Sequence, residues 1–345
     1  MAERRGRRTP NIKTAAVVRT ERVTPHMIRV VLGGEGLADF ECGEFTDHYL
    51  KLQFPVEGVE YPEPFDLARI REELPPEQWP VSRTYTVRRW DPAARELWID
   101  FVYHGDEGVA GPWAANAQPG TLLRFAGPGG GYAPDSGADS HLLIGDESAV
   151  PAIASAVEHL APGARARVFI EVEDPEEEQQ FKSAGDVLVT WIHRGDAPVG
   201  ERLVAAVRGF EFPEGAVQAF VHGEAGFVRE IRRYLRFERE IPRERLSISG
   251  YWRLGHNEDG WQSSKREWNK VDEADEARAE GALAKPVLVL AGRSDCTGPA
   301  APRSAGERLR RGPGAGGFPR AIVEWRRSRN PSVAAIPPQP DGLLF

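Results

Sequence analysis

The spacing of apolar residues changes near residue 140, and this change limits the folds open to the chain. Before it, short alternating runs at 14–19, 27–32 and 48–54 are typical of strands with one buried face. After it, apolar runs alternate with amphipathic helical segments, as in a parallel sheet covered on both faces. We therefore expect a small antiparallel β-barrel followed by a doubly wound parallel-sheet α/β domain.

The barrel is expected over residues 10–134 and the α/β domain over 140–280, with a linker between them. A β-sandwich is the alternative for the first domain, because it also joins short antiparallel strands by turns. The proline-rich residues 55–80 should form a surface excursion with one short helix near 66–73. In the second domain, strands are expected at 141–145, 167–172, 187–192, 217–222 and 246–250, and helices at 151–160, 201–209 and 226–239.

Residues 281–345 are expected to be a disordered extension or a stretch foreign to the natural domain. Gly and Pro make up 18 of these 65 residues, a share typical of disordered segments. The segment carries ten Lys or Arg and four Asp or Glu, whereas the whole chain has a net charge of −8. The two domains that precede it are therefore strongly acidic.

Composition argues against several other classes of protein. The acidic net charge argues against nucleic-acid binding, and no apolar run reaches the roughly 18 residues of a membrane span. The basic N-terminus lacks the apolar segment of a secretory signal. The two cysteines, Cys42 and Cys296, lie far apart, so we expect no disulfide framework, no metal site and a reducing cytoplasmic setting.

Residues 83–86, Arg-Thr-Tyr-Thr, combine a cation, a flat aromatic ring and hydroxyls on a strand-like run. Because side chains alternate along a strand, Arg83 and Tyr85 should share one face and Thr86 should point to the other. A bound flavin needs positive charge at its pyrophosphate, an aromatic ring against its own and a hydroxyl near its reactive nitrogen. The segment therefore suits a flavin, although an ordinary edge strand is the alternative for this tetrapeptide taken alone.

A glycine-rich turn begins eighteen residues after Thr86, at His104-Gly-Asp-Glu-Gly108, and leads into a helical stretch at 109–115. Gly105 and Gly108 leave backbone N–H groups free to face an anion, and the helix start adds to this effect. We interpret the turn as an anion-binding loop. A plain turn is the alternative, and His104 is better explained as a polar residue at a strand end than as a base.

Two later strand-to-helix junctions carry carboxylates. Residues 145–151, Gly-Asp-Glu-Ser-Ala-Val-Pro, open a helix where a doubly wound sheet presents N–H groups to a dinucleotide. The three-glycine fingerprint is absent, and Asp146 and Glu147 would equally suit helix capping. Glu224, in Gly-Glu-Ala-Gly at 223–226, repeats the arrangement. A third glycine-rich segment, 127–132, is expected to be a turn at the domain junction, close to a ligand or simply flexible.

Taken in order, these segments resemble the siderophore-interacting proteins, a branch of the ferredoxin-reductase-like flavoproteins that reduce ferric siderophores. The resemblance extends over about residues 12–280, and five motifs in this order and spacing are specific although each is short. The motifs are Arg-Thr-Tyr-Thr at 83–86, His-Gly-Asp-Glu-Gly at 104–108 through Trp113, Gly-Asp-Glu-Ser-Ala-Val-Pro-Ala-Ile at 145–153, His-Gly-Glu-Ala-Gly at 222–226 and Gly-Tyr-Trp-Arg-Leu-Gly at 250–255.

The resemblance implies that the barrel binds FAD and that the second domain binds NAD(P)H, with NADPH favoured. Arg83 would bind an FAD phosphate, Tyr85 would pack on the isoalloxazine, and Thr86 would lie near its N5 atom. The turn from Gly108 through Ala110 would hold the pyrophosphate. The other cofactor-binding candidates are Thr84, His104, Gly105, Val109 and Trp113 for FAD, and Asp146, Glu147, Ser148, Pro151 and Glu224 for the nicotinamide dinucleotide.

The resemblance further implies that Lys51 and Arg253 would hold an anionic ferric complex over the flavin. Many relatives carry a basic residue in the turn where this chain has Gly129 or Gly130, so the cationic cluster is thinner here and the siderophore class stays open. Acidic residues at 171–178 would repel the 2′-phosphate of NADPH if they lay near the ribose, and Arg194 would offset that charge.

We therefore expect a monomeric, NAD(P)H-dependent ferric-siderophore reductase with no catalytic residue beyond the flavin, because the cofactor carries the redox chemistry. Hydride would pass from NAD(P)H to the flavin, and single electrons would then reduce Fe(III) to Fe(II), which hard oxygen chelators hold less well. Two alternatives stay open. One is a flavoprotein that exchanges electrons between NAD(P)H and ferredoxin or another redox protein, and the other is a non-enzymatic siderophore-binding protein.

Overall fold

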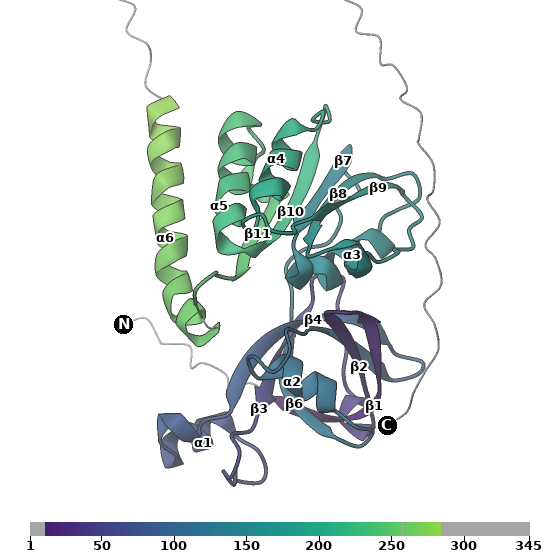
Figure 1. The fold of residues 1–345 in the computed structure, drawn as a ribbon, viewed down its shortest axis with the longest axis vertical. Helices are drawn as coiled ribbons and strands as arrows, with labels where there is room; N and C mark the ends of the chain where they lie inside the picture. Colours follow the sequence, from purple (N-terminus) through teal and green to yellow (C-terminus); the bar gives the residue numbers. More distant parts are fainter. Residues whose placement is uncertain (1–10, 257, 284–345) are drawn as a thin grey trace, which may run out of the picture. The chain divides into compact units, whose positions relative to one another are not determined.

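The structure is a computed structural model that describes residues 11–256 and 258–283. Figure 1 shows its two sheets, a β-barrel formed by the first half of the chain and a parallel sheet with helices formed by the second. Almost all of the predicted tail, together with Cys296, lies outside the described residues.

In the described part of the chain, six strands close into an antiparallel barrel in the order β1-β2-β5-β4-β3-β6. Closure pairs every strand on both sides and leaves no free sheet edge. This confirms the predicted barrel and excludes the sandwich. The strands are β1 (Ile12–Thr24), β2 (Met27–Gly33), β3 (Tyr49–Phe54), β4 (Val81–Asp91), β5 (Glu96–Val102) and β6 (Leu122–Gly129).

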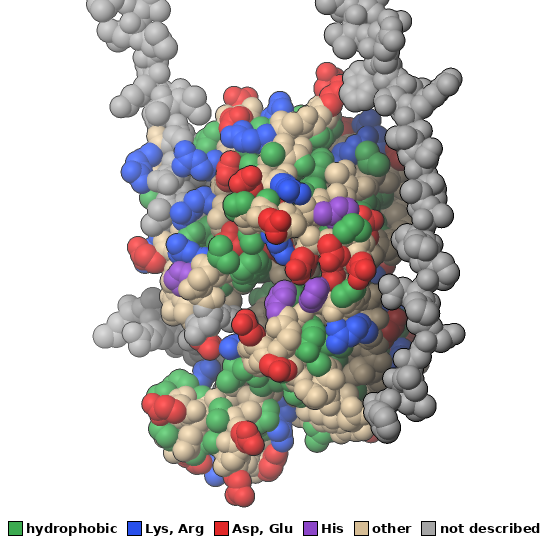
Figure 2. All heavy atoms as spheres, viewed as in Figure 1, with side chains coloured by type: hydrophobic (Ala, Val, Ile, Leu, Met, Phe, Trp, Pro, Cys, Tyr) green, Lys and Arg blue, Asp and Glu red, His purple; other side chains and the backbone are tan. Residues whose placement is uncertain are grey.

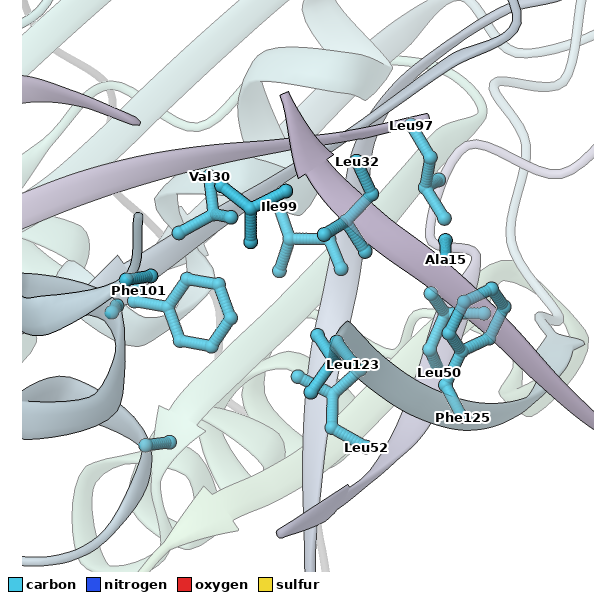
Figure 3. Packing of buried hydrophobic residues seen from close by; sticks show 14 of the residues in the cluster. Ala15, Val30, Leu32, Leu50, Leu52, Leu97, Ile99, Phe101, Leu123 and Phe125 are labelled. Carbon is cyan, nitrogen blue, oxygen red and sulfur yellow. The ribbon is translucent and has the colours of Figure 1, made fainter. Parts of the chain in front are cut away.

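The barrel interior is filled by apolar side chains that alternate along its strands, as Figure 3 shows. Val30 and Leu32 on β2 and Leu50 and Leu52 on β3 are fully buried. Each such side chain contributes about 1.5–3 kcal/mol when removed from water. This packing gives the outer positions of the same strands a rigid support on which to present polar side chains.

Two short helices flank the barrel. Helix α1 (Leu67–Glu73) lies in the predicted excursion, and Asp66 caps it by accepting from the backbone N–H groups of Ala68 and Arg69. The excursion also holds the 3-10 turn η2 (Pro76–Gln78), while η1 (Glu35–Leu37) follows β2. Helix α2 (Ala110–Asn116) follows the glycine turn and buries Ala110 and Ala114 against the barrel core.

The second sheet has five parallel strands in the order β11-β10-β7-β8-β9. The strand order reverses between β7 and β10, and ligands bind such α/β sheets at the carboxyl ends of the strands beside this switch point. Gly145 on β7 lies opposite His222 on β10 there. The strands are β7 (Ser140–Gly145), β8 (Arg165–Val172), β9 (Asp186–His193), β10 (Val217–Glu224) and β11 (Leu246–Trp252).

Helices cover both faces of this sheet, which confirms the predicted doubly wound domain. Helix α3 (Val150–Glu158) shares one buried cluster with Leu143. Helices α4 (Glu201–Gly209) and α5 (Ala225–Arg233) share the other cluster with Leu142, the next residue along β7. The β8–β9 connection has the 3-10 turn η4 (Pro175–Glu177) in place of a helix, and η3 (Glu147–Ala149) and η6 (Arg243–Arg245) precede α3 and β11.

Three sequence predictions differ from the structure. The helix predicted at 226–239 ends at Arg233 and continues as the π-helical turn η5 (Tyr234–Glu238). The segment 127–129, predicted as a turn, forms the end of β6. Helix α6 (Glu258–Leu283) was not predicted at all. Its signal was present in Trp261 and Trp268, which stand seven residues apart and therefore share one helical face.

The barrel and the parallel sheet are joined by polar contacts inside the described unit. The buried Glu177 accepts hydrogen bonds from the Thr24 hydroxyl (2.5 Å) and from the backbone N–H of His26 (3.1 Å). Arg88 on β4 pairs with Glu158 at the end of α3. These contacts set β4, which carries the Arg-Thr-Tyr-Thr segment, against the helical face of the second domain.

Candidate cofactor and substrate site

The first two sequence motifs are linked through aromatic side chains of the barrel core. The Tyr85 ring on β4 lies 4.5 Å from the ring of Phe101, and Phe101 lies 5.6 Å from Trp113 of α2. Tyr85, Val109 and Trp113 all pack against the barrel core. Side-chain contacts through Phe101 therefore connect β4, which carries the cation and the aromatic ring, to the helix that follows the glycine turn.

The glycine turn is open on the side where an anion would approach. Gly105 (φ +68°) and Gly108 (φ +78°) have left-handed backbone conformations, and apart from its chain neighbours no atom of the described residues lies within 4 Å of a Cβ built on either. Within residues 11–256 and 258–283, no side chain caps the first turn of α2, so its first N–H groups have no side-chain acceptor there. His104 is exposed, with its ring 6.3 Å from that of His26. The open turn and the uncapped helix start fit the pyrophosphate of a flavin dinucleotide.

Arg83 is already engaged with a carboxylate. Its guanidinium donates to both oxygens of Asp259 in α6, at 3.1 and 3.3 Å, and to the carbonyl oxygen of Ser82 at 2.9 Å. The Arg83 side chain is only 13% exposed, whereas that of Asp259 is 69% exposed. The planar fork of Arg83 is thus held in the geometry that binds an oxyanion with two parallel hydrogen bonds.

The outer face of β3 and β4 carries the predicted substrate cation. Lys51 is exposed and lies directly opposite Thr84, which is also exposed. Tyr49, two residues earlier, is 40% exposed, and a Cβ at Gly129 would lie 2.6 Å from its ring. Glycine at this position therefore makes room for an exposed aromatic ring beside Lys51. Arg253, the second predicted cation, is half-buried just after β11.

Thr86 faces the second domain rather than the barrel core. It is buried, and its side chain hydrogen-bonds that of Tyr251 on β11. Burial raises the pKa of Tyr251 well above its usual value, and the hydrogen bond with Thr86 opposes this only in part. The Tyr251 ring stands perpendicular to the ring of His222 at 4.9 Å, and His222 stacks on Phe220 at 3.7 Å. An aromatic stack at the switch point thus supports Thr86.

His222 is held neutral by its surroundings. Burial, assisted by the charge of Lys265, lowers the pKa of His222 to about 3. Its Nε2 atom lies 3.0 Å from the Ser247 hydroxyl, and its Nδ1 atom has no hydrogen-bond partner within the described residues. A buried imidazole of this kind favours the neutral form, because charging it would cost the full desolvation of the ring.

The His222→Phe substitution should therefore change how stability depends on pH. Below about pH 6.5, His222 is protonated in the unfolded state. In the folded state it stays neutral until the pH falls to about 3. The stability of the wild type relative to the variant should fall as the pH is lowered from 6.5 to 4.5, by up to about 1.4 kcal/mol per unit. Urea unfolding at several pH values measures this.

The matched control for this prediction is His104→Gln, which changes an exposed histidine. This control separates the effect of removing a histidine from the effect of removing the buried one. A stability difference between wild type and His222→Phe that stays constant over this pH range would contradict the assignment of a buried neutral imidazole.

Asp146 joins three strand ends from a fully buried position. One carboxylate oxygen accepts from the backbone N–H and the hydroxyl of Ser148, at 3.0 and 2.5 Å. The other accepts from the backbone N–H of Glu224 (2.8 Å) and the indole N–H of Trp252 (2.7 Å). Burial and the neighbouring Glu147 charge raise the pKa of Asp146 to about 7, while these donors oppose the shift. Its position identifies a structural role at the switch point.

Glu147 belongs to a charged group at the ends of three neighbouring strands. Arg194, just after β9, pairs with Glu147 at 2.8 Å and with Glu171 at 3.4 Å. Glu171 is buried, accepts from the backbone N–H of Gly200 at 2.9 Å, and has its pKa raised by burial. The sequence analysis predicted that the Arg194 charge would offset the negative charge of residues 171–178. In the structure, Arg194 contacts Glu171 directly.

The remaining predicted nucleotide-site residues occupy helix starts. Glu224 is buried and caps α5, accepting from the N–H groups of Gly226 (2.5 Å) and Phe227 (3.3 Å). Pro151 is buried in the first turn of α3, and Ser148 is half-buried in η3. The capping that the sequence allowed for Asp146 is present in its contact with the Ser148 N–H, and Glu224 is also a helix cap.

Sequence reasoning missed three residues that shape this region. Tyr251 supports Thr86, Trp252 donates to Asp146, and Asp259 pairs with Arg83. Tyr251 and Trp252 lay inside a quoted motif, so their types were visible. Trp252 and its partner Asp146 are 106 residues apart, and Asp259 and its partner Arg83 are 176 residues apart. No local pattern indicates such contacts.

Two family models match the chain. The siderophore-interacting FAD-binding domain matches residues 16–132, and the siderophore-interacting protein model matches residues 138–255. Ferric vibriobactin reductase ViuB of Vibrio cholerae is 35% identical over 256 residues, which cover 72% of this chain and 92% of that protein. The chain belongs to the siderophore-interacting protein family.

Further relatives match over a similar span. The NADPH-dependent ferric-chelate reductase of Escherichia coli is 31% identical over 242 residues, covering 68% of this chain and 91% of that protein. The crystal structure of a siderophore utilization protein from T. fusca has a TM-score of 0.63 and 38% identity, covering 72% of this chain and 95% of that chain. Both family models end before α6 begins.

Other kinds of site find little support in the described residues. Among them, no group of three or more His, Cys, Asp or Glu side chains is arranged to hold a metal ion. No helix within 11–256 or 258–283 is both long and apolar enough to cross a membrane. Burial raises the pKa of the Cys42 thiol to about 11, which makes it a poor nucleophile at neutral pH.

Figure 2 shows acidic and basic side chains interspersed on one face of the protein.

Proposed function

We propose that this protein is an FAD-dependent ferric-siderophore reductase that takes its electrons from NAD(P)H. The observation that carries the proposal is a barrel that matches an FAD-binding domain, in which Phe101 links Tyr85 of the Arg83 segment to Trp113, just after the open Gly105–Gly108 turn. Relatives that share 35% and 31% identity over most of their length are named ferric vibriobactin reductase and NADPH-dependent ferric-chelate reductase.

In this proposal the barrel holds FAD through groups of three kinds. Arg83 binds a phosphate by charge and paired hydrogen bonds, and the N–H groups around Gly108 and Ala110 complete the pyrophosphate site. Tyr85 offers an aromatic surface, and Thr86, held by Tyr251, offers a fixed hydroxyl. When bound, the flavin supplies hydride acceptance from NAD(P)H and single-electron transfer to Fe(III). The protein contributes position and electrostatics rather than a side-chain acid or base.

The nicotinamide nucleotide is assigned to the carboxyl ends of β7 and β10. Ser148 and the backbone around Glu147 border the switch point, where sheets of this kind bind nucleotides. Asp146, Pro151 and Glu224 are proposed to support the site without touching the nucleotide, because they hold the strand ends and helix starts in place through the contacts described above. We favour NADPH, in keeping with the E. coli relative. Arg194, once released from Glu147 or Glu171, is the cation available for a 2′-phosphate.

The ferric chelate is assigned to the outer barrel face that carries Lys51, with Arg253 as a second cation. An anionic complex would be attracted to Lys51 by charge, so its binding should weaken as salt rises. Hard oxygen ligands hold Fe(III) far better than Fe(II), so reduction loosens the metal and releases it. The substrate side of the reaction thus rests on position and charge alone.

The Lys51→Ala substitution should raise the KM for an anionic ferric chelate about threefold to tenfold, because one exposed charge contact is lost. Flavin content should stay at the wild-type level, since Lys51 is assigned to the substrate and not to the cofactor. Steady-state reduction of the chelate, with the visible spectrum of the purified variant, measures both quantities. Lys182→Ala, on the β8–β9 connection, is the matched control and should leave KM unchanged.

A single assay tests the whole proposal. The full chain is purified, its visible spectrum is recorded, and NADPH or NADH oxidation is followed anaerobically with ferric hydroxamate and ferric catecholate chelates. An Fe(II) trap reports the product. Yellow protein that oxidises NAD(P)H and yields trapped Fe(II) is the expected result. Absence of trapped Fe(II) with every chelate would remove the reductase from consideration.

The two other functions are not favoured. A flavoprotein that passes electrons to ferredoxin would be reoxidised faster by a small redox protein than by iron chelate. A non-enzymatic siderophore-binding protein would be colourless and would not consume NAD(P)H. The relatives named above are reductases, and a binding protein has no need of the Arg83 and Gly108 features.

We further propose that the enzyme acts as a monomer in the cytoplasm.

A further inference from the structure

The start of α6 reaches into the proposed flavin site, although α6 lies outside both family models. Trp261 is fully buried, and a Cβ added at Gly250 on β11 would lie 2.9 Å from its ring. Trp268 is also buried, and the Arg229 guanidinium lies 4.8 Å from the centre of its ring. The first turns of α6 are therefore anchored to β11 and α5.

This anchoring places Asp259 at the edge of the barrel. Asp259 stands two residues before Trp261, and both of its carboxylate oxygens accept from Arg83 of β4. Lys265, one turn after Trp261, holds the same helix to β11 by donating to the Ser249 hydroxyl at 3.0 Å. The contact with Arg83 thus comes from a fixed segment whose position is set by buried tryptophans.

A carboxylate and a phosphate use the same face of a guanidinium. Each accepts two parallel N–H···O bonds from the planar fork, so one such pair of donors cannot serve both at once. Asp259 also brings a negative charge next to any phosphate that Arg83 would bind, and like charges at this distance repel. In the structure, Asp259 holds the donors that the proposed function assigns to the flavin phosphate.

We propose that Asp259 competes with the flavin phosphate for Arg83, so that α6 lowers the affinity of the protein for its own cofactor. The inference rests on the proposed function, because it takes Arg83 as the phosphate ligand. Arg83 must exchange one oxyanion for the other as FAD binds, and Asp259 then faces solvent. Since Asp259 is mostly exposed, the exchange costs little and the effect on affinity is moderate.

The Asp259→Asn substitution tests the competition, because it removes the charge and keeps the size of the side chain. The flavin Kd of the apoprotein, measured by quenching of flavin fluorescence at low salt, should fall about twofold to fivefold. The difference should shrink as salt rises. Glu267→Gln is the control, because it removes the same charge from an exposed position of the same helix and should leave Kd unchanged.

The double variant shows whether the gain passes through Arg83. Asp259→Asn should give a smaller gain in an Arg83→Ala background, because no guanidinium is left to release and only the repulsion between the Asp259 charge and the phosphate is removed. Tryptophan fluorescence checks that Trp261 stays buried. An unchanged or raised Kd in Asp259→Asn alone would overturn the inference, the latter by showing that Asp259 positions Arg83. If the wild type binds no flavin, the proposed function fails and the inference fails with it.

Discussion

Replacing Arg83 by alanine should weaken flavin binding about tenfold to hundredfold, because hydrogen bonds to a charged partner are worth about 1.5–3 kcal/mol. The half-buried position of Arg83 on β4 limits competition from water, and its fork is already set for an oxyanion. Less flavin should therefore co-purify with the variant. Titration of the apoprotein with FAD gives the Kd, and the ratio of flavin to protein absorbance gives the occupancy.

The control for this prediction lies on the same strand. Arg89 is exposed and pairs with its neighbour Asp91 at 3.2 Å, so Arg89→Ala removes an equal charge from β4 at a place with no proposed ligand. Its flavin Kd should match the wild type. Arg83→Lys should fall between the two, because an ammonium keeps the charge and loses the paired geometry. A wild-type Kd in Arg83→Ala would reject the assignment of Arg83 to the flavin phosphate.

Replacing Asp146 by alanine should cost about 3 to 5 kcal/mol of stability, the largest loss that we expect from a single substitution here. The change removes a buried acceptor from four donors at once, namely the N–H and hydroxyl of Ser148, the N–H of Glu224 and the indole of Trp252. Three of these donors are backbone or indole N–H groups, which would lose this buried acceptor. Thermal and urea unfolding measure the loss.

A milder aspartate serves as the comparison. Asp174 caps the 3-10 turn η4 by accepting one backbone N–H, that of Glu176 at 2.7 Å. Asp174→Ala should cost only about 0.5–1 kcal/mol, which is the usual effect of losing a cap. Equal losses in the two variants would show that Asp146 acts as an ordinary helix cap and does not tie the ends of β7, β10 and β11 together.

The fold was largely predictable because its signals are local. The alternation of the first strands and the strand–helix rhythm of the second half each depend on a few neighbouring residues, and α4 matched its predicted bounds of 201–209. Helix α6 escaped because its sequence is mostly polar; among its residues with described burial, Trp261 and Trp268 mark its buried face. Tertiary packing of these two rings stabilises the helix, and a mostly polar sequence gives no periodic apolar signal of that packing.

The site residues were predictable by type but not by role. Arg83, Tyr85 and Gly108 stood out because a flavin needs a cation, an aromatic ring and free N–H groups, and the structure brings their segments together. The nucleotide-side carboxylates could equally have been ligands or caps. Their hydrogen bonds decide this, since Asp146 and Glu224 accept from buried protein donors.

The amino-acid sequence by itself determined the order of strands and helices, the two-domain plan and the chemical types gathered at the candidate site. Periodicity, turn residues and motif spacing are properties of neighbouring residues, so the chain states them directly. Only the tertiary structure decided which charges meet. Arg83 and Asp259 are 176 residues apart, and Asp146 and Trp252 are 106 apart. Such pairs form because strand order and helix docking bring distant segments together, and no local rule contains that information.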